Sequence, residues 1–212
     1  MYDAVAIGEV LIDFVTSSTN YVGYPILSAF PGGAPANYLS VLAKFGLKTS
    51  MIAKVGEDTF GRLLRQTLSD LQIDTKQILI DKESFTTLAF VTHDEQGDRE
   101  FSFARKPGAD TCMNVDEVDL SVIKNAKSLY FGTTSLTHEP TRTTVKTAVK
   151  FAKEHDKLII FDPNLRKPLW DDLERAKSEM FWGLSYADIL KISKEELEFL
   201  FTEDMEETSS RI

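Results

Sequence analysis

Short apolar runs alternate with helix-like stretches along most of the chain. Runs such as AVAIG at 4–8 and LIIFD at 158–162 are typical of buried strands, whose side chains are apolar on both faces of a sheet. Between such runs, apolar residues recur three and four positions apart, as they do at 145–152, which predicts helices with one buried face. This alternation predicts an α/β fold with a mostly parallel sheet covered by helices. Further strands are expected at 50–56, 128–132 and 187–193, and further helices after Pro35 and after Asp58.

Two regions break this alternation and predict a small accessory sheet. The segment TTLAFVTHDEQGDREFSFAR at 86–105 consists of two β-rich runs around a turn that contains a glycine, which predicts a hairpin. The runs LIDFVTSS at 11–18 and PILSAF at 25–30 are expected to join the same sheet. We therefore expect one α/β domain over residues 1–212, with a β-rich lid formed by strands approximately within 11–30 and 86–105.

The composition narrows the class of partner and the compartment. The 24 Lys and Arg residues are outnumbered by 33 Asp and Glu residues, and the formal net charge of −9 would repel a nucleic acid backbone. The N-terminus has no basic segment ahead of its apolar run, and no apolar stretch reaches the roughly 18 residues of a membrane span. We therefore expect a soluble cytoplasmic protein that binds neither nucleic acid nor membrane.

The stretch FPGGAPANYLSVLAKFG at 30–46 begins a helix with residues that suit a ligand site. Gly32 and Gly33 permit a close approach to the backbone, and Pro35 sets the dihedral angle of the first helical turn. Asn37 offers a hydrogen-bond donor and an acceptor, which suits a ligand rich in hydroxyl groups. Ligands of open α/β sheets also bind where strands end and helices begin. The pattern by itself leaves two interpretations open, a structural turn and the floor of a ligand site.

The stretch GGAPAN before an apolar helix, followed by AKVGEDTFG at 53–61, resembles the N-terminal signature of the ribokinase-like (PfkB) sugar kinases. Segments spread over essentially the whole chain are similar to the fructokinase branch of that family: GEVLIDF, TTLAFV, FSFARKPGAD, FGTTSLTHEP, FDPNLRKPLW and ADILKISKEEL. The resemblance implies a Rossmann-type, mostly parallel sheet flanked by helices, with a small β-sheet lid.

The resemblance also implies a reaction. It identifies the chain with an ATP- and Mg²⁺-dependent carbohydrate kinase that binds a small-molecule sugar, and the expected reaction is phosphorylation of the 6-hydroxyl of fructose. A kinase for 2-keto-3-deoxygluconate, ribose or a nucleoside would share the same architecture, and so would a non-catalytic sugar-binding module. These remain alternatives.

The resemblance places the sugar near the start of the chain. Asp13 would accept hydrogen bonds from sugar hydroxyls, and Gly32, Gly33 and Asn37 would line the floor of the site, with the two glycines also serving as the hinge of the lid. The alternative for Asp13 is a solvated aspartate at the end of a strand. The alternative for Asn37 is a cap at the helix start.

Four further residues match positions that contact substrate or phosphate in this branch. Phe103 would pack against the apolar side of a sugar ring, and Arg105 would reach hydroxyl or phosphate groups. Asn164 and Arg166 follow the strand at 158–162, where Asn164 would contact substrate and Arg166 would neutralise phosphate as a catalytic residue. A lid face turned toward the core is the alternative for the hairpin phenylalanines, and for Phe101 it is the one we expect. A surface salt bridge is the alternative for Arg166.

The last predicted strand leads into a candidate nucleotide and metal segment. Many relatives carry Asn-x-x-Glu after this strand, close to magnesium and phosphate, whereas this chain has Ser193 and Glu196. By resemblance, Lys191 and Ser193 would contact ATP and Glu196 would bind Mg²⁺. Ser193 and Glu196 also match a capping box at the start of the following helix, and both roles can hold at once.

One family signature does not occur in these 212 residues. In the family, a Gly-Ala-Gly-Asp stretch opens a helix whose N–H groups bind the transferring phosphoryl group, and its aspartate is the general base. We therefore expect an N-terminal portion of a longer kinase, lacking the C-terminal part of the fold and inactive as an isolated chain. The edges of the lid sheet also favour a homodimer formed through the lid.

Overall fold

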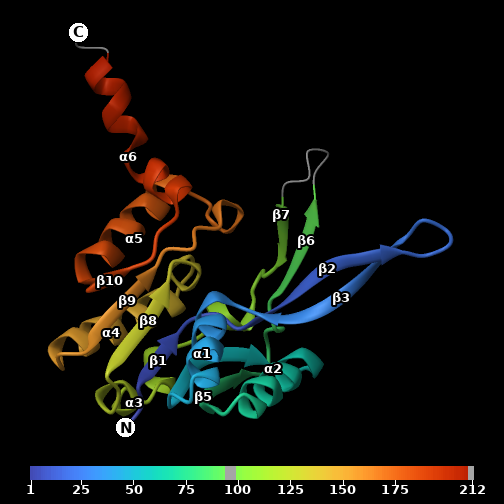
Figure 1. Ribbon diagram of the computed structural model, residues 1–212, viewed down its shortest axis with the longest axis horizontal. Coiled ribbons are helices and arrows are strands. Elements are labelled where there is room, and N and C mark those ends of the chain that lie inside the picture. The colour runs from blue at the N-terminus through green and yellow to red at the C-terminus, as the bar shows by residue number, and fades with distance from the viewer. Residues whose placement is uncertain (94–98, 210–212) are drawn as a thin grey trace.

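A six-stranded parallel sheet forms the body of the protein (Figure 1). The structure, a computed structural model, describes residues 1–93 and 99–209. The strand order is β10-β9-β8-β1-β4-β5, which puts β1, the first strand of the chain, inside the sheet. The strands are β1 (Ala4–Ile7), β4 (Thr49–Gly56), β5 (Ile73–Asp81), β8 (Ser128–Gly132), β9 (Leu158–Asp162) and β10 (Ile189–Leu190).

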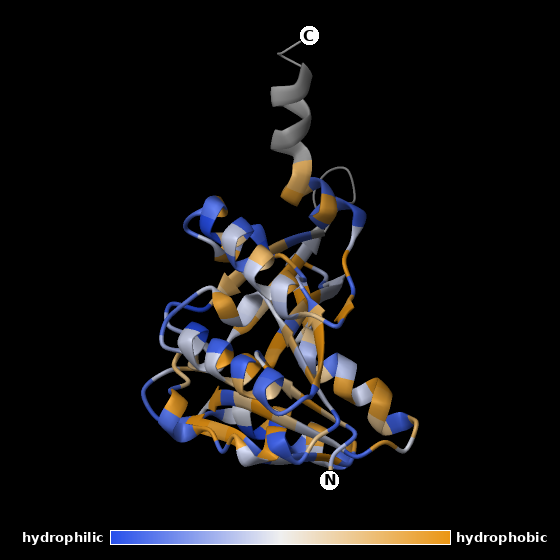
Figure 2. Ribbon diagram, turned by 90° about the vertical axis from the view of Figure 1, so that its left-hand side faces the viewer, coloured by the Kyte–Doolittle hydropathy of each residue, from blue (hydrophilic) through white to orange (hydrophobic). Residues whose placement is uncertain are grey.

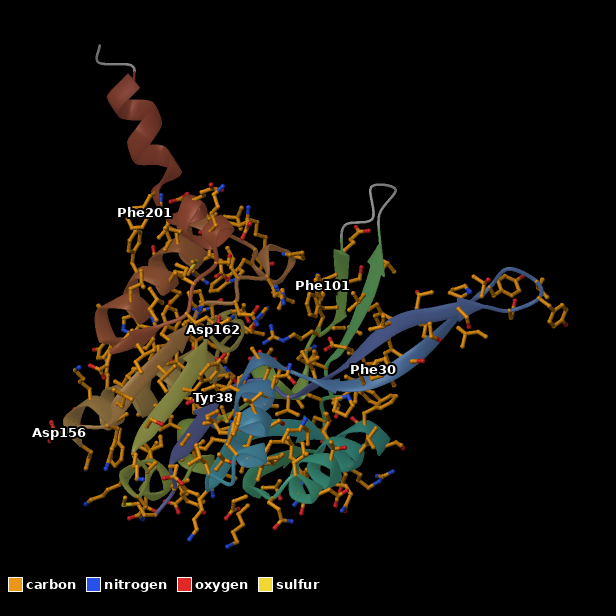
Figure 3. The ribbon with its side chains drawn as sticks, in the orientation of Figure 1. Phe30, Tyr38, Phe101, Asp156, Asp162 and Phe201 are labelled. Atoms are coloured by element: carbon orange, nitrogen blue, oxygen red, sulfur yellow. The ribbon has the colours of Figure 1, made fainter. Side chains whose placement is uncertain are left out.

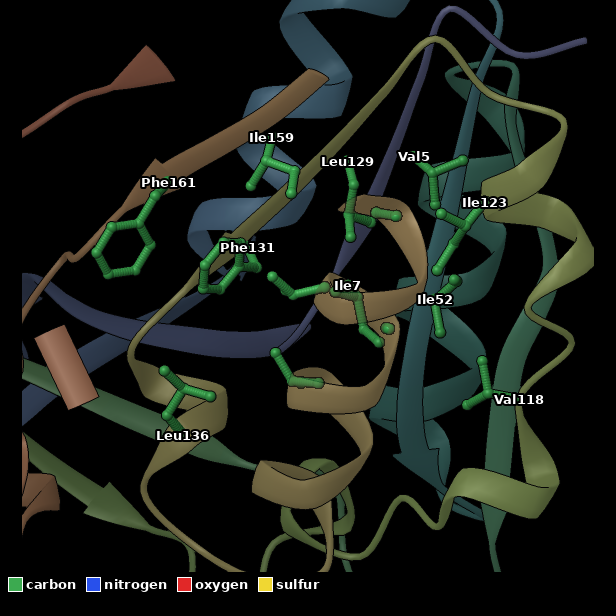
Figure 4. Packing of buried hydrophobic residues seen from close by; sticks show 14 of the residues in the cluster. Val5, Ile7, Ile52, Val118, Ile123, Leu129, Phe131, Leu136, Ile159 and Phe161 are labelled. Atoms are coloured by element: carbon green, nitrogen blue, oxygen red, sulfur yellow. The ribbon is translucent and has the colours of Figure 1, made fainter. Parts of the chain in front are cut away.

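Helices cover both faces of this sheet, because successive strand residues point to opposite sides. Val5 and Ile7 of β1 belong to the core on one face, which Figure 4 shows from close by. Ala4 and Ala6 belong to the core on the other face. The helices on the two faces carry hydrophilic as well as hydrophobic residues (Figure 2), as helices with one buried side do. They are α1 (Ala34–Lys44) and α2 (Thr59–Asp70) on one face, and α3 (Ser121–Lys124), α4 (Thr141–Glu154) and α5 (Leu173–Tyr186) on the other, with α6 (Lys194–Ser209) following β10.

The predicted α/β alternation is confirmed, with one strand much shorter than expected. Asp58 caps α2 and accepts hydrogen bonds from the backbone N–H groups of Phe60 and Gly61. The apolar run at 187–193 forms only the two residues of β10. β10 is an edge strand that pairs with β9 alone, so ladder hydrogen bonds hold it from one side.

A four-stranded mixed sheet projects from the body and forms the predicted lid (Figure 1). Its order is β3-β2-β6-β7, with β2 antiparallel to β3, β2 parallel to β6, and β6 antiparallel to β7. The hairpin of β6 and β7 is confirmed, while its turn at 94–98 lies outside the described residues. The lid strands are β2 (Leu11–Thr19), β3 (Pro25–Gly32), β6 (Leu88–His93) and β7 (Arg99–Ala104).

The lid is attached where the body strands end. β1 leads into β2 through Gly8, Glu9 and Val10, and β3 leads into α1 through Gly33. Gly33 has a φ of 108°, and a Cβ atom there would lie 2.5 Å from the backbone oxygen of Glu9. Because no other residue fits this crossing without strain, the second glycine of the GG pair is required by the fold itself.

Candidate active site

A cavity of about 380 Å³ lies between the lid and the carboxyl ends of the body strands. This is where open α/β sheets bind ligands, and the volume suits a small molecule. Lid strands, the start of α1 and the loops after β1, β8 and β9 all contribute to its wall. The lining residues are Glu9, Leu11, Asp13, Val15, Gly33, Ala34, Asn37, Val91, Phe101, Phe103, Thr134, Asn164, Arg166 and Leu169.

Asp13 lies in this cavity on β2, and the carboxylate packs over the backbone of Gly32. A Cβ atom at Gly32 would meet Asp13 Oδ2 at 2.1 Å, so only glycine leaves room for the carboxylate there. Burial raises the pKa of Asp13, and the nearby charge of Arg166 lowers it. Asp13 is therefore a half-buried carboxylate that faces a cation, and not a solvated residue at a strand end. Gly32 supports Asp13 from behind and does not itself line the cavity.

Glu9, and not Asn37, supplies the side-chain hydrogen bond at the start of α1. The cap residue is Gly33, which has no side chain, and Glu9 Oε1 accepts a hydrogen bond of 3.2 Å from the backbone N–H of Ala34. Asn37 lies one turn into the helix, where its backbone N–H donates to the Gly33 oxygen at 3.0 Å. The interpretation of Asn37 as a cap is therefore wrong, and its exposed amide lines the cavity.

Phe101 and Phe103 form an aromatic wall on one face of β7. Their rings are nearly parallel, with centroids 6.2 Å apart, and Figure 3 shows Phe101 on the lid hairpin. The guanidinium carbon of Arg166 lies 4.7 Å from the centroid of the Phe101 ring, within the range of a cation–π interaction. The expectation that Phe101 faces the core is wrong. Residues two positions apart on a strand share a face, and the face of β7 that carries Phe101 and Phe103 is turned toward the cavity and Arg166.

Asn164 and Arg166 reach the cavity from the loop after β9. Asn164 has a φ of 44°, a left-handed conformation that asparagine adopts more readily than most residues. The chain turns sharply there, so that Asn164 and Arg166 both line the cavity. Arg166 lies beside Phe101, and its charge lowers the pKa of Asp13, so its setting is the cavity and not a surface salt bridge.

Arg105, like Gly32, is a predicted substrate residue that does not line the cavity. The chain leaves β7 after Ala104 and turns into the body, where the Arg105 side chain is buried. It forms an ion pair with Asp110 and donates to Thr134 and Thr137. Its contact with substrate stays a prediction.

Lys191, Ser193 and Glu196 also lie outside the cavity lining. Lys191 Nζ lies 2.9 Å from Asp162 Oδ2, at the end of β9. The capping box is confirmed, because the Ser193 N–H donates to Glu196 Oε2 at 2.8 Å and the Glu196 N–H donates to Ser193 Oγ at 3.2 Å. Glu196 Oε1 accepts from the Leu165 N–H at 2.7 Å, which ties this helix to the loop after β9. Roles of these residues toward nucleotide and metal stay predictions.

Besides Phe101, Glu9 is a residue of this site that the sequence-based assignment missed. It is 3% exposed, and its Oε2 atom has no hydrogen-bond partner among the described residues. Burial raises its pKa to about 7, with Asp110 adding to the rise and Arg105 opposing it. A charged residue directly after the buried run AVAIG, at the carboxyl end of a predicted parallel strand, is the signal that could have found it.

Comparison with protein families identifies the group to which the chain belongs. The model described as pfkB family carbohydrate kinase matches residues 1–211. The chain belongs to the pfkB family of carbohydrate kinases. Curated relatives of this pfkB chain include probable fructokinase-6, chloroplastic, from Arabidopsis thaliana, 42% identical over 198 residues that cover 92% of the chain and 52% of the relative. Fructokinase-1 from Zea mays is 40% identical over 92% of the chain and 61% of the relative.

Solved structures confirm the ribokinase-like fold. The fructokinase from Xylella fastidiosa superposes with a TM-score of 0.87 at 28% identity, covering 96% of this chain and 63% of that chain. An uncharacterized sugar kinase, PH1459 from Pyrococcus horikoshii in complex with ATP, has a TM-score of 0.87 at 32% identity, covering 95% and 66%. The pfkB chain thus spans about half to three fifths of the curated relatives named above.

The structure also bears on membrane association. No helix within residues 1–93 and 99–209 combines the length and apolar character needed to cross a bilayer. The cytoplasmic location stays a prediction, and one of the relatives carries the word chloroplastic in its name.

Proposed function

We propose that the protein carrying this chain transfers the γ-phosphoryl group of ATP to the 6-hydroxyl of fructose. The observation that supports this most directly is the cavity beneath the lid, where the Asp13 carboxylate, the Arg166 guanidinium and the two rings of β7 line one small space. Relatives named as fructokinases, at 40 to 42% identity, support fructose as the acceptor. The crystal structure of a double mutant of the fructokinase from Vibrio cholerae O395, 29% identical to this chain, contains fructose, ADP and a potassium ion.

The wall of the cavity offers the contacts that a sugar requires. An ionised Asp13 accepts hydrogen bonds from hydroxyl groups, and the Asn37 amide both donates and accepts. Phe101 and Phe103 provide an apolar surface for the C–H face of the ring. Polar groups on one side and aromatic rings on the other would fix the orientation of the sugar, which is the main contribution of a protein to phosphoryl transfer.

Cationic groups near the loop after β9 suit the phosphate chain of ATP. Arg166 carries a fixed charge in the cavity. Lys191 directly follows β10, and its largely exposed side chain pairs with Asp162, the last residue of β9. Ser193 follows Lys191 at the start of α6 and completes the proposed nucleotide segment.

Magnesium would supply further charge neutralisation on the phosphates when bound. The Glu196 carboxylate fits a role through water, because each of its oxygens already accepts one backbone N–H and keeps a second lone pair. Closure of the lid would keep water away from the phosphoryl group.

The test is an ADP-release assay on the whole protein, with MgATP and one acceptor at a time: fructose, ribose, glucose, 2-keto-3-deoxygluconate or adenosine. Fructose should give the highest kcat/KM, by about tenfold or more over the next acceptor. A higher kcat/KM for another acceptor would contradict the proposal that fructose is the substrate, but it would still support kinase activity. Fructose binding by calorimetry without turnover of any acceptor would indicate a sugar-binding module instead. Residues 1–212 alone should show no turnover.

We further propose that two copies associate through their lids. β3 is an edge strand of the lid sheet, and its exposed side chains include Ile26 and Phe30, the latter labelled in Figure 3. Sedimentation equilibrium should give a dimer for the whole protein, and Phe30→Ser should weaken it. A monomer at concentrations of tens of micromolar would refute this proposal.

A further inference from the structure

The junction between the lid and the body contains a buried ion pair, Arg105–Asp110, to which the proposed reaction assigns no role. We propose that Arg105 is a positioning residue, which locks the base of the lid to the loop that carries Thr134 and thereby sets the shape of the cavity, and that it is not a substrate ligand. The effect on lid position stands on geometry alone. The effect on turnover rests on the proposed function.

The guanidinium group of Arg105 is already engaged by protein atoms. Nε and Nη2 donate to Asp110 Oδ2 at 2.9 and 2.7 Å, Nη2 also donates to the Thr134 oxygen at 3.0 Å, and Nη1 donates to Thr137 Oγ1 at 2.8 Å. The side chains of Arg105 and Asp110 are 2% and 1% exposed. Four of the five N–H groups of the guanidinium are thus committed to buried partners, and a sugar could recruit those four only by breaking charge-assisted bonds, which are among the strongest in a protein interior.

On the lid side, Asp110 gathers three strands at one point. Its Oδ1 atom accepts from the hydroxyl of Thr87, directly before β6, while Arg105 directly follows β7. The Thr87 oxygen accepts from the N–H of Ile12 in β2 at 3.1 Å. The packing is tight, because a Cβ atom at Gly108 would lie 2.0 Å from Thr87 Oγ1 and 2.8 Å from Asp110 Oδ1. A shift of the Asp110 side chain would therefore displace the groups hydrogen-bonded to it and, through them, β2, β6 and β7.

On the body side, the same pair is anchored to the wall of the cavity. The Thr134 oxygen accepts from Arg105 and, at 2.7 Å, from the Thr137 hydroxyl, and Thr134 lines the cavity. The Asp110 oxygen accepts from Thr141 Oγ1 at 2.9 Å, at the first residue of α4. Arg105 therefore spans from a lid strand to the loop between β8 and α4 through direct hydrogen bonds.

Arg105 is also the cation that offsets two buried carboxyl groups. Its charge lowers the pKa of Glu9, whereas Asp110 and, above all, burial raise it. Removing the positive charge would leave the acids unbalanced in a dry interior, and that alone can prevent folding. Arg105→Lys avoids this because it keeps the charge while it loses the planar, forked hydrogen-bonding group.

The experiment measures lid position directly in the whole protein. Spin labels are placed at Thr16→Cys on the lid and Lys150→Cys on α4, both at exposed positions. Cys112 and any cysteine of the whole protein outside residues 1–212 are replaced by serine. Labelled protein is diluted with unlabelled protein, so that pulsed dipolar spectroscopy reports only distances within one chain. Arg105→Lys is compared with Arg62→Lys, an exposed arginine of α2 that donates to Thr59.

We expect one narrow distance distribution for the labelled parent and for Arg62→Lys, and a distribution at least twice as wide for Arg105→Lys. Thr137→Val removes the hydroxyl that accepts from Arg105 and donates to the Thr134 oxygen, and it changes no charge, so it should broaden the distance distribution less. With fructose and MgATP, Arg105→Lys should lower kcat/KM about tenfold or more through both kcat and KM. Addition of fructose should narrow its distribution again.

An unchanged distance distribution in folded Arg105→Lys would overturn the proposal. If thermal stability alone fell, the role of Arg105 would be structural only. If the KM alone rose, Arg105 would be a substrate ligand. If Arg105→Lys does not fold, Thr137→Val decides, and an unchanged width there overturns the proposal. Absence of turnover in the parent would refute the proposed function and leave the distance result intact.

Discussion

Replacing Glu9 by glutamine should change how the stability of the protein depends on pH. The Glu9 carboxyl is buried between the start of α1 and the Arg105–Asp110 pair, and its pKa is raised from 4.5 to about 7, mainly by burial. A carboxyl group whose pKa is higher in the folded state stabilises that state when protonated. Its contribution is fully present below the unfolded pKa and is lost as the pH rises through the folded pKa.

The size of the effect follows from the shift. A rise from 4.5 to about 7 corresponds to about 3 kcal/mol of unfolding free energy, most of it lost between pH 5 and pH 8. Glutamine keeps an acceptor for the Ala34 N–H but cannot ionise. Its amide N–H group would lie where Oε2 has no partner among the described residues, at a cost of about 1–3 kcal/mol that is the same at every pH.

The assay is urea unfolding of the wild type and Glu9→Gln at pH 5 and pH 8, followed by tryptophan fluorescence. The unfolding free energy of the variant minus that of the wild type should be about 2 to 3 kcal/mol more positive at pH 8 than at pH 5. The exposed Glu57→Gln serves as the control, with a difference near zero. If Glu9→Gln shows the same difference at both values of pH, then Glu9 is not a buried acid with a raised pKa.

Three further predictions concern the cavity and the base of the lid. Asp13→Asn should raise the KM for fructose about tenfold or more, because a hydrogen bond to a charged group contributes about 1.5–3 kcal/mol, whereas the surface variant Asp70→Asn should behave as wild type in the same assay. In urea titrations, Gly46→Ala should lower the unfolding free energy by about 1–2 kcal/mol, and Gly33→Ala should lower it by clearly more. Both positions have a positive φ, but only at Gly33 would the added Cβ atom clash with the backbone. Equal losses would contradict the clash. Phe101→Leu should raise the KM for fructose about threefold to tenfold through loss of the ring surface, and an unchanged KM would remove Phe101 from the site.

The sequence by itself determined the α/β architecture, the lid hairpin and the helix caps. Apolar runs and helical periodicity predicted the α/β alternation, and the paired β-rich runs predicted the lid, because both patterns depend on neighbours a few positions away. Local hydrogen bonding likewise made the Asp58 cap and the Ser193–Glu196 capping box predictable.

Only the tertiary structure decided which side chains meet. The period of β7 puts Phe101 and Phe103 on one face, but whether that face meets the core or a cavity depends on the loop that brings Arg166, far away in the sequence. Arg105 was expected to reach substrate, yet it bonds with Thr134, a partner 29 positions away. Glu9 gained its raised pKa from burial against groups that are distant along the chain. Burial and electrostatic pairing are properties of three-dimensional surroundings, and motif spacing does not carry them.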